Sequence, residues 1–530
     1  MSRFATRTSD FEAKAVLCAL LIWLGFLVFH PIIRLAFDIE LGPADSLELI
    51  AGQELKLNYR TRQPPLYTWF ISISGQVFGP GALASQIVKY GFMAIAGLGF
   101  YLAGLSATKD RKKAALGSLA ALLIFNVGFT IHDQSTHSVA LIAAIALLCA
   151  GYMALCRSET PVAYVIIGVA GAIAVLSKHS GWILVLAFPF AFLLSKKLRP
   201  RILNLKLASA VAATLIAALP LIYFLLINHD EATRHLGSTV GVSAGGHPLW
   251  QLLRGQAHLV GGAVALSLPL AVLLAACFGS RGFVPAVAKR PSAGAGHVSS
   301  VPDAVKIMFA SGFIGLGAIA IGLLVSGAGK FPSRHLLVVM LPIALALTWG
   351  IPSKALHWRN VRRFLVIVAL LQVGLMITRT GSYALPGKPF CNRCNHLLPT
   401  KQLAAWIETE GYAGAIIVTG DRLTGGHLIS RLQTDRVVYL GLPRSARPNN
   451  LAILNDARQT CIFITRSDAK TMDESPKFEE VLTSNSVRAP NYETVTARWP
   501  KRIDGRVRRT TWKIWKLSRT DPLCSSSGQN

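Results

Sequence analysis

The residues best suited to chemistry are the carboxylates of a polar segment near the amino terminus. Residues 38–69 interrupt an apolar chain and include Asp45 and Glu48. The segment closes with Pro64 and Pro65, which prevent a helix from continuing. A carboxylate within hydrogen-bond reach of a hydroxyl can remove its proton as a general base. We therefore expect this segment to hold a reactive carboxylate.

Two alternatives compete for these acids. Asp45 and Glu48 have the S/T/D-x-x-E spacing of a capping box, so Asp45 could simply cap a short helix at the membrane surface. Asp38 and Glu40 are rival bases, because they lie nearer the end of the preceding apolar run.

A second polar group is the sequence H-D-Q-S-T-H-S at 132–138. Asp133 and His137 are four residues apart and could share one face of a helix, so His132, Asp133 and His137 are possible ligands of a divalent cation. A metal site usually needs three protein ligands, and we favour Asp133 as an acid that shapes the site without a metal.

Composition places these polar segments in a membrane protein. Of the 530 residues, 52% are hydrophobic and 15% are charged, well below the quarter that is usual in soluble domains. The net charge of +28 does not indicate a nucleic-acid partner, because most basic residues before position 380 lie in short loops between apolar runs. Such loops are typical of the cytoplasmic face.

Apolar periodicity predicts a mostly α-helical, polytopic fold of about eleven transmembrane helices. The expected spans are 15–37, 82–107, 114–131, 135–156, 161–177, 181–195, 206–228, 259–279, 305–328, 333–350 and 361–378. Loop charge places the amino terminus in the cytoplasm, and the odd number of spans then places the region after 379 on the outer face. The polar segments then share the outer face.

The position of the acids separates two classes of membrane protein. No Asp or Glu falls within a predicted span, whereas a proton-coupled transporter usually places a carboxylate at mid-membrane. This favours chemistry at the outer surface. A non-enzymatic translocator of lipid or polysaccharide remains the alternative.

The first outer segment resembles that of the GT-C glycosyltransferases, and more closely family 39, which includes protein O-mannosyltransferases and lipid A aminoarabinose transferases. The resemblance covers roughly residues 10–380. It rests on Asp45, Tyr59, the Pro64–Pro65 pair and the aromatic exit at Tyr67 and Trp69. The chain departs at Ser46, where the family often has Glu, and Glu48 is a candidate replacement. Further similarities are 132–138 and F-P-S-R-H-L at 331–336.

The resemblance implies transfer of a sugar from a polyprenyl-phosphate donor to an acceptor hydroxyl on the periplasmic side, usually with inversion. Asp45 would be the general base, with Glu48 and Asp133 as further catalytic residues. A departing phosphate needs cations, for which Arg62, Lys178 and Arg334 are favoured; interfacial anchoring is the alternative for Lys178 and Arg334. Lipid A, another surface glycan or a protein could be the acceptor.

The composition changes to that of a soluble domain near residue 381. Predicted strands at 415–419, 437–440 and 461–464, with a helix near 425–433, indicate a small periplasmic α/β domain over 381–530. Residues 1–380 would form the catalytic transmembrane module. Cys391 and Cys394 form a C-x-x-C motif, which favours a disulfide over zinc because no second motif accompanies it.

Overall fold

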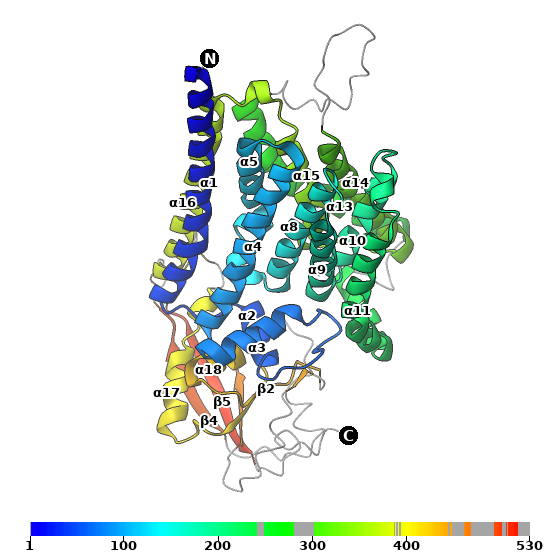
Figure 1. The fold of residues 1–530 in the computed structure, drawn as a ribbon. Coiled ribbons are helices and arrows are strands. Elements are labelled where there is room, and N and C mark those ends of the chain that lie inside the picture. Colours follow the sequence, from blue (N-terminus) through cyan, green and yellow to red (C-terminus); the bar gives the residue numbers. More distant parts are fainter. Residues whose placement is uncertain are drawn as a thin grey trace.

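The computed structural model describes residues 2–240, 248–279, 302–385, 387, 391, 394–443, 446–447, 461–467, 492–500, 505 and 507–517. The chain forms a helical bundle with a small sheet at one end, and the amino terminus lies at the opposite end of the bundle (Figure 1).

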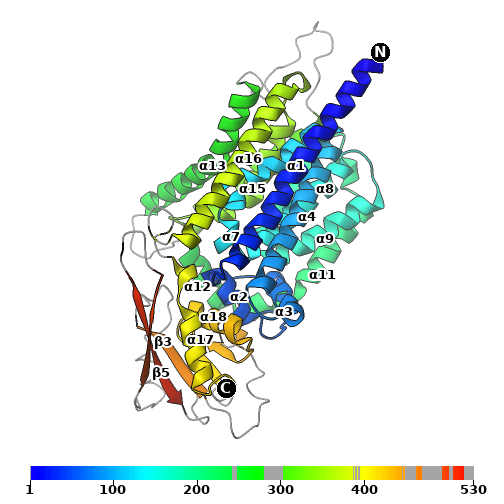
Figure 2. The same ribbon diagram turned by 90° about the vertical axis from the view of Figure 1, so that its left-hand side faces the viewer.

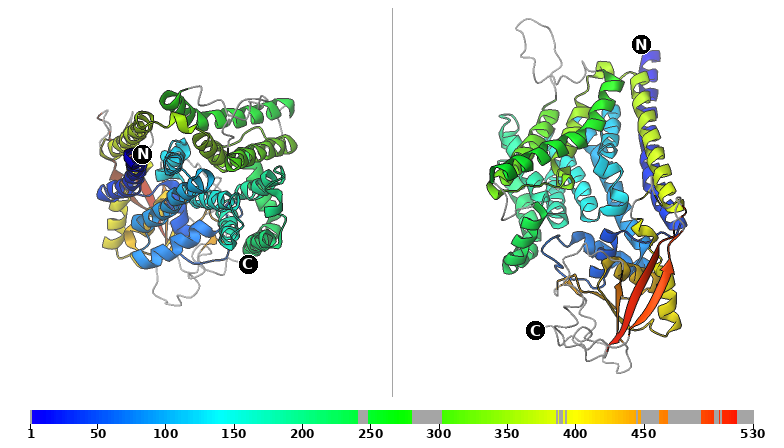
Figure 3. Two further views of the ribbon diagram at one scale, coloured as in Figure 1. Left: turned by 45° about the horizontal axis from the view of Figure 1, so that its top comes forward. Right: turned by 180° about the vertical axis from the view of Figure 1, so that it is seen from behind.

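Seven of the described helices are long and apolar enough to cross a membrane. They are α1 (Ser2–Ala36), α4 (Ala82–Thr108), α8 (His137–Leu155), α11 (Leu205–Ile227), α13 (Pro248–Phe278), α14 (Asp303–Ser326) and α16 (Trp358–Ala384). Helices α1 and α16 run side by side along one flank of the bundle (Figures 2 and 3). A polytopic membrane protein is therefore confirmed.

The other helices of the bundle are shorter than the roughly 20 residues of a straight span. They are α5 (Arg111–Leu122), α9 (Pro161–Ser177), α10 (Gly181–Leu193) and α15 (Leu337–Trp349). All eleven predicted segments contain a helix, but the number that cross the membrane stays a prediction. Smaller elements are α6 (Phe125–Gly128), α7 (Ile131–Gln134), α12 (His229–Val240), η1 (Arg199–Arg201), η3 (Ser333–His335) and η4 (Ser353–Ala355).

The predicted span 114–131 is not one helix. Helix α5 ends at Leu122, and the chain folds back so closely that a Cβ at Gly128 would lie 2.1 Å from the Leu122 carbonyl oxygen. This close approach requires glycine, and the turn that it allows delivers α7 to the polar end of the bundle.

Two short helices, α2 (Pro43–Ala51) and α3 (Leu66–Phe78), lie between the bundle and the sheet (Figure 1). Helix α2 begins with Pro43, whose missing N–H costs nothing in the first turn. Its N-cap is Gly42, and no side chain caps it. The capping interpretation of Asp45 is therefore wrong. Its side chain instead contacts Ser85 and Lys89 of α4.

The carboxy-terminal sheet is mixed, with strand order β2-β1-β3-β5-β4. Its strands are β1 (Ile416–Thr419), β2 (Val437–Tyr439), β3 (Cys461–Arg466), β4 (Glu493–Arg498) and β5 (Arg509–Leu517). The first three are parallel, β5 is antiparallel to β3, and β4 is antiparallel to β5. Helices α17 (Thr400–Thr409) and α18 (Arg422–Leu432) pack beside the sheet, after η5 (Asn395–Leu397). The predicted α/β character is confirmed.

Helix α18 packs directly on α2, and glycine permits the contact. A Cβ at Gly426 would lie 2.4 Å from Cα and Cβ of Ser46, closer than real Cβ atoms approach. The same helix places Arg431 against the link between α1 and α2, where its guanidinium donates to both Asp38 carboxylate oxygens at 2.8 Å and to Glu40 at 3.0 Å. Asp38 and Glu40, the alternatives to Asp45 as the base, thus form hydrogen bonds with Arg431 of the carboxy-terminal region.

We expect Gly426→Ala to destabilise this junction by about 1–3 kcal/mol, because an added methyl group in a close-packed contact forces the helices apart. The measurement is the thermal unfolding midpoint of the detergent-solubilised protein. Gly261→Ala in α13 is the control, since its Cβ would meet nothing within 4 Å. Equal midpoints for the two variants would contradict the assigned packing.

Candidate active site

A cavity of about 700 Å³ lies where the polar end of the bundle meets the carboxy-terminal region. Its walls come from distant parts of the chain: α1 supplies Arg34, α2 supplies Glu48, α8 supplies His137, α16 supplies Arg379 and α18 supplies Arg422. The hollow therefore depends on packing between elements that are far apart in sequence.

The lining of the cavity is strongly cationic. Among the described residues that line it are six arginines and one lysine, against a single carboxylate, that of Glu48. The favoured phosphate-binding residues Arg62, Lys178 and Arg334 all line this cavity, although 116 and 156 residues separate them in sequence (178 − 62 and 334 − 178). The other cations are Arg34, Arg60, Arg379 and Arg422.

Sequence reasoning missed three of these arginines. Arg34 and Arg379 lie within long apolar helices. A charged residue in such a helix costs free energy in the membrane and therefore often marks a functional site, so the sequence could have indicated both arginines. Arg422 follows a predicted strand of the soluble region, and nothing local distinguishes it from an ordinary surface arginine.

Arg62, Lys178 and Arg334 form a cluster of like charges, which we call the cation cluster. No described carboxylate forms an ion pair with any of them. The charge of Arg334 lowers the pKa of Lys178, and the charge of Arg62 lowers the pKa of Arg334, in each case after burial. Burial, reinforced by Arg334, lowers the pKa of Lys178 to about 7, and its ammonium donates to the Ser138 hydroxyl at 2.9 Å. Cations gathered without counter-ions favour binding of an anion.

His335 follows Arg334 in sequence and is influenced by the same positive charges. Burial, followed by the charges of Lys178 and Arg334, lowers the pKa of His335 to about 2, so the imidazole stays neutral. The charges of Lys178 and Arg334 thus act on His335 in addition to its burial.

Glu48 is the one carboxylate among the described residues that line the cavity. It forms a salt bridge with Arg60, accepts from the Thr68 hydroxyl at 2.6 Å, and lies 3.0 Å from Nε2 of His137. Burial alone would raise the pKa of Glu48, but Arg60 and His137 lower it to about 2. Glu48 is therefore ionised and held by three donors.

Asp45 is not among the described residues that line the cavity. Its side chain is buried and points into the bundle, where Lys89 Nζ lies 3.0 Å from one carboxylate oxygen and Ser85 donates to the other at 3.1 Å. Tertiary contacts separate the two acids, since Ser85 and Lys89 of α4 bind Asp45, whereas Arg60 and His137 bind Glu48. This placement does not support the predicted role of Asp45 as the general base.

The possible metal ligands are dispersed. His132 stacks on His30 with ring centroids 3.9 Å apart, and its Nδ1 lies 2.5 Å from the Tyr90 hydroxyl, whereas His137 faces Glu48. Asp133 belongs to α7, but its side chain lies outside the described residues. Within the described part of the chain, no group of three His, Cys, Asp or Glu could hold a metal ion.

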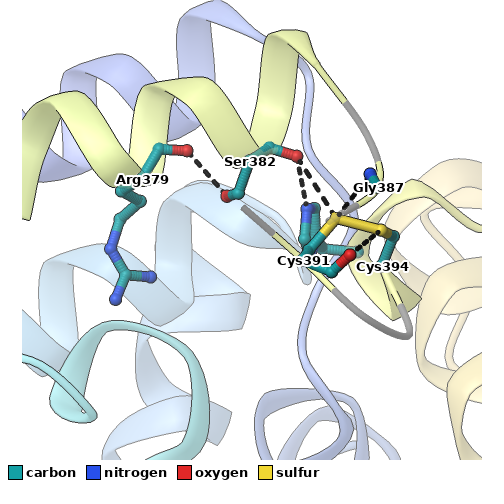
Figure 4. Close-up of a disulfide and its surroundings, with 6 residues drawn as sticks. Arg379, Ser382, Gly387, Cys391 and Cys394 are labelled. Atoms are coloured by element: carbon teal, nitrogen blue, oxygen red, sulfur yellow. Dashed lines mark hydrogen bonds between the residues drawn. A yellow bond between two sulfur atoms is a disulfide. The ribbon is translucent and has the colours of Figure 1, made fainter. Parts of the chain in front are cut away.

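The predicted disulfide between Cys391 and Cys394 is present, and both cysteines line the cavity. Figure 4 shows it beside the end of α16, where Ser382 donates to the Arg379 carbonyl. The backbone carbonyl of His396, which follows the disulfide, accepts from the Glu40 N–H at 3.1 Å. The cross-link thus lies in the same wall of the cavity as Ser382 and His396.

Comparisons with known proteins agree with this architecture. Residues 62–228 match the family described as dolichyl-phosphate-mannose-protein mannosyltransferase. The lipopolysaccharide core galacturonosyltransferases RgtB and RgtA of Rhizobium johnstonii are each 24% identical to the chain, with 76% of this chain and 79% and 80% of theirs covered.

Crystal structures of ArnT from Cupriavidus metallidurans have a similar fold. The form bound to undecaprenyl phosphate gives a TM-score of 0.56 and the apo form 0.55, each at 13% identity, covering 96% of this chain and 98% of that chain. Fold, site and relatives together support a membrane glycosyltransferase that is similar to those of the GT-C class. The resemblance found in the sequence is confirmed, and the enzyme is favoured over the translocator.

Proposed function

We propose that the protein transfers a uronic acid, of the galacturonic acid type, from a polyprenyl-phosphate carrier to a hydroxyl of lipopolysaccharide core or a related surface glycan. The observation that supports this most strongly is the charge of the cavity, with seven cationic side chains against one carboxylate among its described lining residues. Such a cavity suits a donor with two anionic groups, the phosphate of the carrier and the carboxylate of the sugar. The two curated relatives support the choice of sugar and acceptor.

The reaction needs few groups from the protein. In an inverting displacement the acceptor oxygen attacks the anomeric carbon while the carrier phosphate departs. The leaving phosphate is already ionised, so cations stabilise it and no general acid is required. We assign this task to the cation cluster, while the acceptor loses its proton in the part of the cavity near Glu48. The remaining cations surround the sugar carboxylate.

Loop charge supports an orientation with a cytoplasmic amino terminus and a periplasmic cavity. We assign residues 1–380 to the catalytic transmembrane module and 381–530 to a periplasmic domain that completes the cavity with Arg422.

The test supplies purified protein in detergent with polyprenyl-phosphate galacturonate or, in parallel, a neutral polyprenyl-phosphate hexose. Lipopolysaccharide core, lipid A and a peptide serve as alternative acceptors, and transfer is measured by mass spectrometry. We expect transfer of the uronic acid to the core. Faster transfer of the neutral hexose would overturn the choice of sugar, and modification of lipid A or peptide instead would overturn the choice of acceptor.

A further inference from the structure

The outward face of α16 carries arginines at its start and apolar side chains further along. Arg359, Arg362 and Arg363 lie in the first two turns of the helix, and all three are exposed. They lie at the end of the bundle opposite the cavity, because α16 reaches the cavity only near its own end, at Ser382. A hollow of about 430 Å³ on this face is lined by the three arginines and by Trp358, Val366 and Ile367.

One continuous stripe joins these cations to an apolar surface. Its members follow one another at intervals of three or four residues and are Arg359, Arg363, Val366, Leu370, Val373 and Ile377. Such intervals keep side chains on one face of a helix. The four apolar members are 47% to 64% exposed, so the bundle leaves them uncovered. From Arg363 to Val373 the helix rises about 15 Å, half of the roughly 30 Å hydrocarbon core of a bilayer.

The three arginines have no counter-charge in the part of the chain that the structure describes. The acids nearest in the adjoining helix α1 already have partners. Asp10 pairs with Lys14 at 2.8 Å, and Glu12 lies 3.3 Å from Lys112. The sequence between α13, which also contacts α16, and α14 contains no Asp or Glu over 279–302. Like charges three and four residues apart repel each other, so an anion from the surroundings would stabilise this face.

We propose that this face of α16 binds an anionic glycerophospholipid of the surrounding membrane. The guanidinium groups hold the phosphate through charge-assisted hydrogen bonds, and one leaflet's acyl chain lies along the apolar stripe. Trp358 stands at the level of the head group, where tryptophan is enriched, and its ring packs against Phe11 with centroids 5.2 Å apart.

The combination of the two halves of the stripe selects this class of ligand. A soluble phosphate would leave the apolar half unused, whereas a zwitterionic lipid brings no net charge to the three arginines. The site is far from the cavity and does not depend on the proposed sugar transfer.

The experiment measures binding of phosphatidylglycerol to the delipidated full-length protein by native mass spectrometry. Arg362→Gln/Arg363→Gln is compared with the wild type and with the control Arg157→Gln/Lys196→Gln, which removes two exposed charges from the loops after α8 and α10. We expect Kd for the first bound lipid to rise about 10- to 30-fold in the arginine variant and to change little in the control. The difference should shrink at high ionic strength, because salt screens exposed charges.

Three other ligands test what the site recognises. Phosphatidylcholine should bind the wild type and the arginine variant equally weakly, and glycerol 1-phosphate should not displace phosphatidylglycerol. Equal affinity of the wild type and the folded arginine variant for phosphatidylglycerol would overturn the proposal, as would equal affinity of the wild type for the two phospholipids. Displacement by glycerol 1-phosphate would assign the arginines to a soluble anion instead. Tighter binding of undecaprenyl phosphate that is lost in the arginine variant would overturn the choice of lipid.

Discussion

Asp45→Asn is expected to lower the free energy of unfolding by about 3–5 kcal/mol, because it leaves the ammonium of Lys89 buried without its counter-charge. Both side chains are fully buried and 3.0 Å apart. Loss of activity in this variant would therefore not identify Asp45 as a catalytic base. The thermal midpoint of the detergent-solubilised protein, with and without undecaprenyl phosphate, measures the effect.

A double variant separates stability from catalysis at this pair. In Asp45→Leu/Lys89→Met, both charges are replaced by apolar side chains of similar size, a change that is often neutral or stabilising for a buried ion pair. We expect the double variant to recover both the midpoint and sugar transfer. A folded double variant with no transfer would restore Asp45 to the role of base.

The affinity for the carrier phosphate should fall as the pH rises from 7 to 9. Burial and the charge of Arg334 lower the pKa of Lys178 to about 7, so its positive charge is present below that pH and lost above it. A phosphate monoester is already mostly dianionic in this range, so the ligand changes little. If binding requires the ammonium, Kd for undecaprenyl phosphate rises up to about tenfold per pH unit.

Lys178→Arg is the matched control, because a guanidinium keeps its charge throughout this range. Its Kd should vary little between pH 7 and 9, whatever its absolute value. A wild-type Kd that does not change over the same range would remove Lys178 from the phosphate site.

The broad architecture could be predicted because bilayer-length apolar segments leave few alternatives. The predicted helix bounds were wrong where close packing, and not composition, determines where a helix ends. Hydropathy alone cannot show that Gly128 brings the chain back against Leu122, so one predicted span became α5, α6 and α7. Strands β4 and β5 were not predicted, and β4 is mostly exposed and has no apolar run.

The cations of the candidate site were easier to predict from the sequence than its carboxylate. Arg62, Lys178 and Arg334 were chosen because they share one predicted face, and cations on one face can meet around an anion. Asp45 and Glu48 are three residues apart and therefore neighbours on the surface of α2, so apolar periodicity cannot tell which of them borders the cavity. The contacts of Asp45 with Ser85 and Lys89 decide it, and these residues lie about 40 positions further along the chain.

The salt bridges of Arg431 with Asp38 and Glu40 have a consequence for protein engineering. A chimera could exchange the region after α16 between two such transferases. It would separate Arg431 from Asp38 and Glu40 and leave both carboxylates without this partner. Functional exchange should therefore require that the link between α1 and α2 be transplanted together with its matching carboxy-terminal half.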